Sequence, residues 1–138
     1  IFESAAICLY LADKYSYGKL APKREDDQLR AEYLKWMVFS VGSLESVVAR
    51  MFTHMNTPEE EKITREYVAR ESAIFSLALT PLLQKQEYIL KTGFSAADIM
   101  LGAILPGASE YLIEGNSAME DYLLRLKERE AAKRAQVF

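Results

Sequence analysis

One stretch in the second half of the chain constrains its fold more than any other. From Gly93 to Leu105 the sequence reads as the beginning and body of one helix. Ser95 is the expected N-cap and Asp98 stands three residues later, so each side chain can satisfy an exposed backbone N–H of the other in a capping box. No residue after Asp98 in this stretch carries a charge, and a helix that is apolar all round must be enclosed by other elements. The sequence therefore predicts a wholly buried core helix.

Helical patterns cover most of the remaining chain and predict an all-α fold. A long helix is expected over 25–54, and Thr57 followed by Pro58 predicts the start of a second long helix over 57–83. The short connection between them requires the two helices to lie antiparallel. Shorter helices are expected over 108–113 and 117–129. The apolar stripe predicted for the second long helix consists of Ile63, Tyr67, Ile74, Ala78 and Leu82.

The segment after Ser4 predicts a helix of a different kind. None of the residues from Ala5 to Ala12 is charged, so this helix needs cover on more than one side. The helices that follow can cover one face, whereas the other face implies a partner that the sequence does not contain. The chain has no initiator methionine and opens directly into this helix, which Gly18 is expected to end. We therefore interpret the chain as a fragment.

Composition and charge exclude several classes of function. The 138 residues, half of them hydrophobic, suffice for one compact core but not for a second full domain. A net charge of −3, without a basic cluster longer than Lys133-Arg134, gives no electrostatic support for binding nucleic acid or an anionic membrane. The single cysteine fits a reducing compartment. Because no signal-peptide pattern and no apolar run near the ~20 residues of a membrane span is present, we expect a soluble, cytoplasmic protein.

Glu3 and Ser4 are the only candidate site in the sequence. A serine hydroxyl and the first free N–H groups of a helix bind anions, and the helix dipole reinforces them. The adjacent Glu3 can accept from an ammonium group, so the pair suits the amino-acid end of a ligand; an ordinary helix cap is the alternative. His54 and Cys8 are not accompanied by a catalytic set, and neither metal-ligand spacing nor a glycine-rich phosphate loop occurs.

Several motifs, in order along the whole chain, resemble the cytosolic glutathione transferases of bacterial type. Three of them are similar to the C-terminal helical domain of that family, and one is similar to the last helix of its thioredoxin-like N-terminal domain. They are Phe94-Ser95-Ala96-Ala97-Asp98-Ile99, Tyr88-Ile89-Leu90 and Leu126-Lys127-Glu128-Arg129, and then Glu3-Ser4-Ala5-Ala6-Ile7 with Tyr10, Leu11 and Tyr15. Gln86 and Lys91 stand where many members carry glycine, and Glu130 replaces a frequent proline. These departures concern local loop and helix-end geometry.

The resemblance implies a domain organisation and a function. Residues 1–17 would be the terminal helix of a truncated thioredoxin-like domain, 18–24 a linker, and 25–138 the helical C-terminal domain. Glu3 and Ser4 would hold the γ-glutamyl group of glutathione, the co-substrate, and no cofactor would be needed. The parent, meaning the longer protein of which this chain would be a fragment, would be a homodimer that conjugates glutathione to hydrophobic electrophiles, as in detoxification. The alternative is a non-catalytic relative that serves as a protein-interaction module.

The family places its hydrophobic substrate pocket along the first long helix, where small residues interrupt the apolar pattern. A glycine inside a helix costs about 1 kcal/mol relative to alanine. Close packing or a bend would explain these residues, and so would room for a ligand. The thiol-activating residue of the family lies early in the N-terminal domain, so this chain alone is expected to be inactive. The pocket candidates are Trp36, Met37, Phe39, Ser40 and Ser43.

Overall fold

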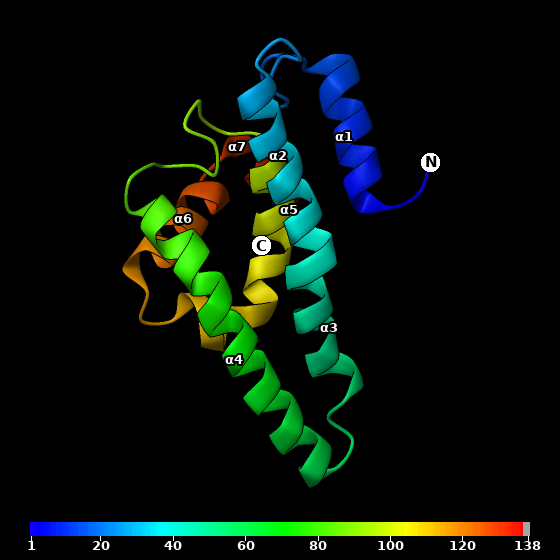
Figure 1. Ribbon diagram of the computed structural model, residues 1–138, viewed down its shortest axis with the longest axis vertical. Helices are drawn as coiled ribbons and strands as arrows, with labels where there is room; N and C mark the ends of the chain where they lie inside the picture. The colour runs from blue at the N-terminus through cyan, green and yellow to red at the C-terminus, as the bar shows by residue number, and fades with distance from the viewer. Residues whose placement is uncertain (137–138) are drawn as a thin grey trace.

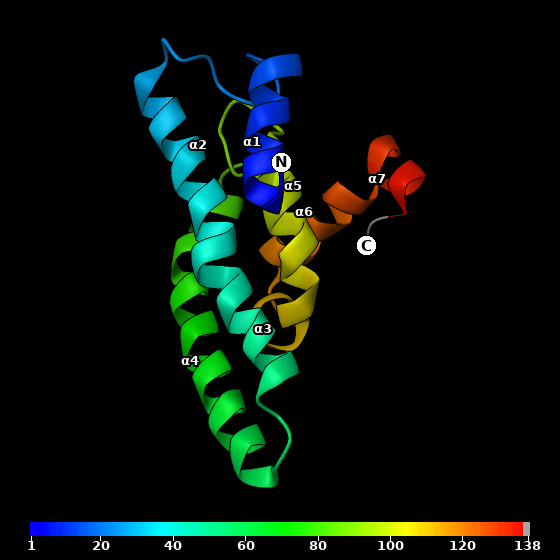
Figure 2. The ribbon, with the colours of Figure 1, turned by 90° about the vertical axis from the view of Figure 1, so that its right-hand side faces the viewer.

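The computed structural model describes residues 1–136, and within them the regular structure is helical. Two antiparallel rods, α2 with α3 and then α4, run along the length of the molecule (Figure 1). Helices α5 and α6 pack beside them, and α7 projects from one side (Figure 2). The predicted all-α fold is confirmed. The helices are α1 (Ser4–Tyr15), α2 (Asp27–Phe39), α3 (Glu45–Thr53), α4 (Pro58–Leu83), α5 (Ala96–Ile104), α6 (Ser117–Lys127) and α7 (Glu130–Ala135).

The capping box predicted at the start of the central helix α5 is present. The Ser95 N–H donates to Asp98 Oδ2 over 2.8 Å. The other carboxylate oxygen, Oδ1, accepts from the Ile89 N–H at 2.9 Å and from the Tyr122 hydroxyl at 3.0 Å. Burial raises the pKa of Asp98, while these hydrogen bonds act in the opposite direction. One fully buried carboxylate therefore joins α5 to the loop before it and to α6.

The central helix is not wholly buried, which corrects the prediction from the sequence. Ile99 is 40% exposed and Ala103 is also exposed, on the face opposite the rest of the core. These two side chains line an apolar cavity of about 410 Å³ that Leu126 and Arg129 also border. A charge-free sequence showed that the helix could be buried, but it did not show how many sides the neighbouring elements cover.

The segment Ala96–Ile113 is long and apolar enough, by length and composition alone, to cross a membrane. In the structure it is divided into α5, a 3-10 turn (Leu105–Ala108) and a π-helical turn (Ser109–Ile113). Just over half of it, 56%, is buried inside the bundle. This burial is typical of the core helix of a helical bundle.

The first long helix is present as α2 and α3, joined by a π-helical turn, Ser40–Leu44. Here the Glu45 N–H donates to the carbonyl of Ser40, five residues back. The buried Ser40 hydroxyl donates to the carbonyl of Trp36 over 2.8 Å, a local bond that loosens the helical ladder. The small residues Ser40, Gly42 and Ser43 thus lie in a widened helical turn.

The second long helix, α4, begins as predicted but buries a different face. Thr57 Oγ1 accepts from the Glu60 N–H at 3.2 Å, and the Glu60 carboxylate accepts from the Asn56 N–H at 3.0 Å. The predicted stripe was wrong, because Ile63 and Ile74 are 50% and 53% exposed. The buried stripe of α4 consists instead of Thr64, Val68, Ser72, Phe75, Leu79 and Leu83.

Helix α1 lies along an edge of the bundle and is covered on one face only (Figure 1). Ala12 is buried, and Ala5, Cys8 and Leu9 pack against the core. On the other side Tyr10 and Leu11 are nearly half exposed. This arrangement agrees with the prediction that the later helices cover only one side of a charge-free helix.

We expect the chain to associate through this uncovered face at micromolar concentration, because apolar patches larger than a few hundred Å² commonly bind a partner. Leu11→Glu should weaken the association about tenfold or more, as measured by sedimentation velocity. Leu77→Glu, on an exposed position of α4, tests the alternative that the long helices associate instead. A monomeric wild type that binds no hydrophobic dye would contradict the expectation.

Candidate functional site

The candidate site from the sequence lies at the first turn of α1. Ser4 is the first helical residue, and Glu3 precedes it as the N-cap. The Ile7 N–H donates to the Glu3 carbonyl over 2.9 Å, which leaves the N–H groups of Ser4, Ala5 and Ala6 without partners inside the helix. The side chains of Glu3 and Ser4 are both exposed. The Glu3 carboxylate makes no cap to the helix, so both side chains are available to a ligand.

The backbone of Glu3 is strained. Its φ and ψ angles are 70° and 114°, a region that residues with a Cβ seldom occupy. Such a conformation costs on the order of 1 to 3 kcal/mol, and in proteins it concentrates at ligand-binding positions. This strained residue is the one that directly precedes α1 and its free N–H groups.

The chemistry of this turn fits a zwitterion. The free N–H groups, the Ser4 hydroxyl and the positive end of the helix dipole favour a carboxylate. The Glu3 carboxylate favours an ammonium group, with which it can form a charge-assisted hydrogen bond. An α-amino acid group carries both charges on one carbon, so it can satisfy Glu3 and Ser4 together.

The five predicted pocket residues lie elsewhere, on α2 and the π-helical turn. Trp36, Met37 and Ser40 are buried. The Trp36 ring packs edge-on against Phe39 at 5.3 Å, and Phe39 packs edge-on against Phe75 of α4 at 5.1 Å. Ser43 is half-buried. None of the five lines either of the two cavities described here, so their role in a substrate pocket stays a prediction.

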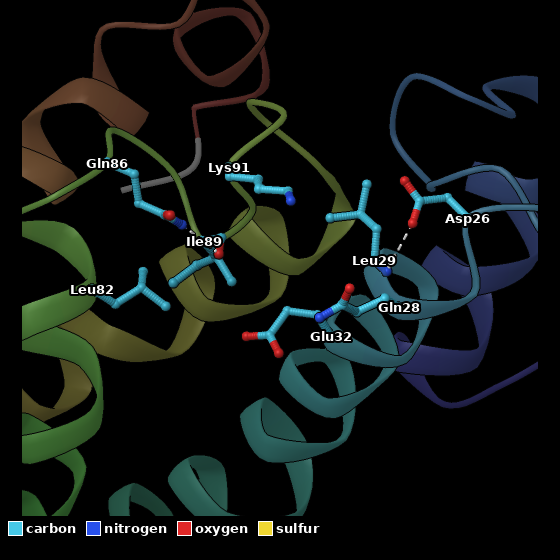
Figure 3. A pocket seen from close by; sticks show the side chains of 8 residues that line it. All are labelled: Asp26, Gln28, Leu29, Glu32, Leu82, Gln86, Ile89 and Lys91. Carbon is cyan, nitrogen blue, oxygen red and sulfur yellow. Dashed lines mark hydrogen bonds between the residues drawn. The ribbon is translucent and has the colours of Figure 1, made fainter.

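A polar cavity of about 230 Å³ was not predicted from the sequence (Figure 3). It lies between the start of α2, the end of α4 and the loop that leads to α5. Glu32 and Lys91 contribute opposite charges to its wall, and the Gln86 amide donates to the carbonyls of Tyr88 and Ile89 at 2.7 and 2.8 Å. Gln86 and Lys91 are the loop residues that depart from the family pattern. The other lining residues are Asp26, Gln28, Leu29, Leu82 and Ile89.

The remaining chemically distinctive side chains are not arranged for catalysis. His54 is exposed, and its Nδ1 lies 2.7 Å from the Thr53 hydroxyl. Cys8 is half-buried, and burial raises the pKa of its thiol, which disfavours a reactive thiolate. Within residues 1–136, no group of three or more His, Cys, Asp or Glu side chains is placed to hold a metal ion.

Comparisons with known proteins extend over almost the entire chain. It is 30% identical over 98% of its length to a GST-like protein of Streptococcus mutans serotype c, but it spans only about half, 54%, of that relative. A crystal structure of a glutathione transferase from Burkholderia graminis, with two glutathione molecules bound per subunit, matches 97% of the chain at 28% identity with a TM-score of 0.82. One from Pseudomonas putida matches 97% at 24% identity with a TM-score of 0.80. The chain spans 58% and 60% of these two proteins.

The helical fold and these similarities define the structural class of the chain. The arrangement of helices is that of the C-terminal helical bundle of glutathione transferases. No protein-family model matches the chain. Sequence and fold together support the glutathione transferase family for this chain, to whose members it is similar over almost its whole length.

Proposed function

We propose that the chain is part of a glutathione transferase that conjugates glutathione to electrophilic, hydrophobic small molecules. We assign residues 1–17 to the last helix of a thioredoxin-like domain, 18–24 to the linker and 25–138 to the helical domain. The observation that carries the proposal is the exposed first turn of α1, where strained Glu3 and Ser4 combine an ammonium acceptor with anion-binding N–H groups. The two glutathione molecules per subunit in the Burkholderia graminis protein support glutathione as the ligand.

The proposed reaction divides the work between this chain and the rest of the parent. Ser4 and the free N–H groups bind the α-carboxylate of the γ-glutamyl group, and Glu3 binds its ammonium. These contacts, which form the Glu3 and Ser4 grip, orient the glutathione, whose thiolate attacks the electrophile. We assign the residue that activates the thiol to the thioredoxin-like domain. This chain therefore contributes binding and orientation, and we name no catalytic residue in it.

We place the parent in the cytoplasm as a homodimer. The long helices support a subunit interface, because Val38 of α2 and Leu77 of α4 are 64% and 78% exposed although both are apolar. A non-catalytic interaction module would use the same surface. Glutathione binding distinguishes the two candidates, since a module that only assembles with other proteins has no need of the Glu3 and Ser4 grip.

Glutathione should bind the chain and perturb the amide resonances of residues 4–7. Ser4→Ala and Glu3→Gln should each weaken binding about tenfold, because the first removes a hydrogen bond to the α-carboxylate and the second removes the negative charge that pairs with the ammonium group. Titration by NMR or calorimetry measures the affinity. Ser46→Ala is the matched control. Ser46 lies in α3, away from the first turn of α1, and its hydroxyl donates to the carbonyl of Ser43.

The same preparation should not accelerate the reaction of glutathione with a chlorinated aromatic acceptor. Turnover above the uncatalysed rate would contradict the assignment of thiol activation to another part of the parent. A wild-type chain that fails to bind glutathione at millimolar concentration would instead favour the interaction module.

A further inference from the structure

An ion pair joins α1 to the helical bundle. Asp13, near the end of α1, accepts two hydrogen bonds from Arg30 of α2, with Nη2 to Oδ2 at 2.6 Å and Nη1 to Oδ1 at 2.7 Å. Arg30 Nη1 also lies 3.2 Å from the carbonyl of Pro22 in the linker. The Arg30 and Asp13 side chains are 16% and 24% exposed. A two-point contact of this kind fixes direction as well as distance.

The arginine is itself held in place. Its guanidinium lies over the ring of Tyr33, 5.4 Å from the ring centre. Tyr33 is fully buried, and burial raises the pKa of its phenol to about 12, so the ring is neutral at physiological pH. Arg30 is therefore clamped between a rigid aromatic face and the carboxylate of Asp13.

The rest of α1 packs on the bundle, chiefly on α5, through small or partly buried side chains. Ala12 is its only fully buried residue, and Ala5, Cys8 and Leu9 contact the core only partly. Small and partly exposed side chains allow a helix to slide or rotate more easily than interlocked large ones. Among residues 1–136, the hydrogen bonds between Asp13 and Arg30 are the only side-chain hydrogen bonds from α1 to another helix.

We infer that Asp13 and Arg30 are positioning residues for the Glu3 and Ser4 grip. The pair lies at one end of α1 and the grip at the other, nine residues away, which is about 14 Å along a helix. A small rotation at the anchored end therefore becomes a large displacement at the grip. This inference rests on the proposed function for its ligand, glutathione, but not for the anchoring of α1.

The test compares Asp13→Asn with Lys14→Gln in the full chain. Asparagine keeps the shape of Asp13 but loses its charge. Lys14 is the adjacent charged residue, and its ammonium contacts only Tyr10 and Tyr15 of the same helix. In Asp13→Asn the amides of α1 should exchange hydrogen about tenfold faster and glutathione should bind about tenfold more weakly, since each factor of ten corresponds to about 1.4 kcal/mol. Exchange in α5 should not change, and the control should resemble wild type.

Each outcome decides a separate point. Unchanged exchange in α1 would overturn the anchoring, and faster exchange with unchanged glutathione affinity would overturn the positioning of the grip. A wild type that binds no glutathione, combined with faster exchange in Asp13→Asn, would refute the proposed function and leave the anchoring confirmed. If Asp13→Asn does not fold, Arg30→Lys supplies the same test, because it keeps the charge and loses the second hydrogen bond. In that variant the same two changes should appear, and their absence would overturn the inference.

Discussion

Asp98→Ala should lower the free energy of unfolding by about 3 to 5 kcal/mol, the largest effect we expect from a single substitution in this chain. Alanine would leave the Ile89 N–H, the Ser95 N–H and the Tyr122 hydroxyl without their acceptor. Asp98 is fully buried, so water cannot replace the carboxylate unless the core opens. Urea unfolding followed by circular dichroism measures the change.

Two further variants separate the components of this loss. Tyr122→Phe removes one donor and leaves the carboxylate in place, so it should cost only about 1 kcal/mol. Asp98→Asn keeps one acceptor oxygen but turns an amide donor toward another donor, so its effect should lie between the two. A denaturation midpoint for Asp98→Ala that matches wild type would show that the network does not stabilise the fold.

Gly107→Ala should lower the free energy of unfolding by about 1 to 3 kcal/mol, because the added methyl group has no room. A Cβ at position 107 would lie 2.4 Å from Cγ1 of Val48 in α3. Valine is stiff about its first side-chain torsion, so it cannot swing away without moving the backbone. The substitution should therefore push the 3-10 turn at Leu105–Ala108 away from α3. Thermal and urea unfolding report the loss.

A double-mutant cycle with Val48→Ala tests that contact directly. Removing the valine methyl groups makes space for the new Cβ, so the two substitutions together should cost at least about 1 kcal/mol less than the sum of their separate effects. Gly42→Ala is the matched control. A Cβ there would meet only Val38 Cγ1, at 3.8 Å, and it should leave stability unchanged or raise it slightly. Additive effects of the first pair would contradict the steric explanation.

Local rules predicted the boundaries of the helices better than their orientation. The capping box at Ser95 and the Thr57 cap of α4 depend on residues three apart, and both are present. The predicted stripe of α4 was wrong because apolar residues occur on both faces of this helix and the buried face also carries Thr64 and Ser72. Thr64 is buried and its hydroxyl donates to the carbonyl of His54 at 2.7 Å, a partner that no pattern within α4 could reveal.

The candidate functional residues show the same contrast between local sequence signals and contacts between distant segments. Glu3 and Ser4 are adjacent in sequence, so the prediction that they act together depends on no contact between distant segments. The polar cavity of Figure 3 is built from three separate segments. Its formation depends on how the loop around Gln86 returns to the start of α2, which follows from packing between distant elements and leaves no periodic pattern in the sequence.

The π-helical turn at Ser40–Leu44 has a consequence for how α2 and α3 share one side of the molecule. The buried positions Tyr33, Met37, Ser40, Leu44 and Val47 follow one another in steps of three or four, so the same side of the rod stays buried across the widened turn. That side packs on α5 through α2 and on α4 through α3. The π-helical turn is thus accommodated without moving either half of the rod away from its neighbour.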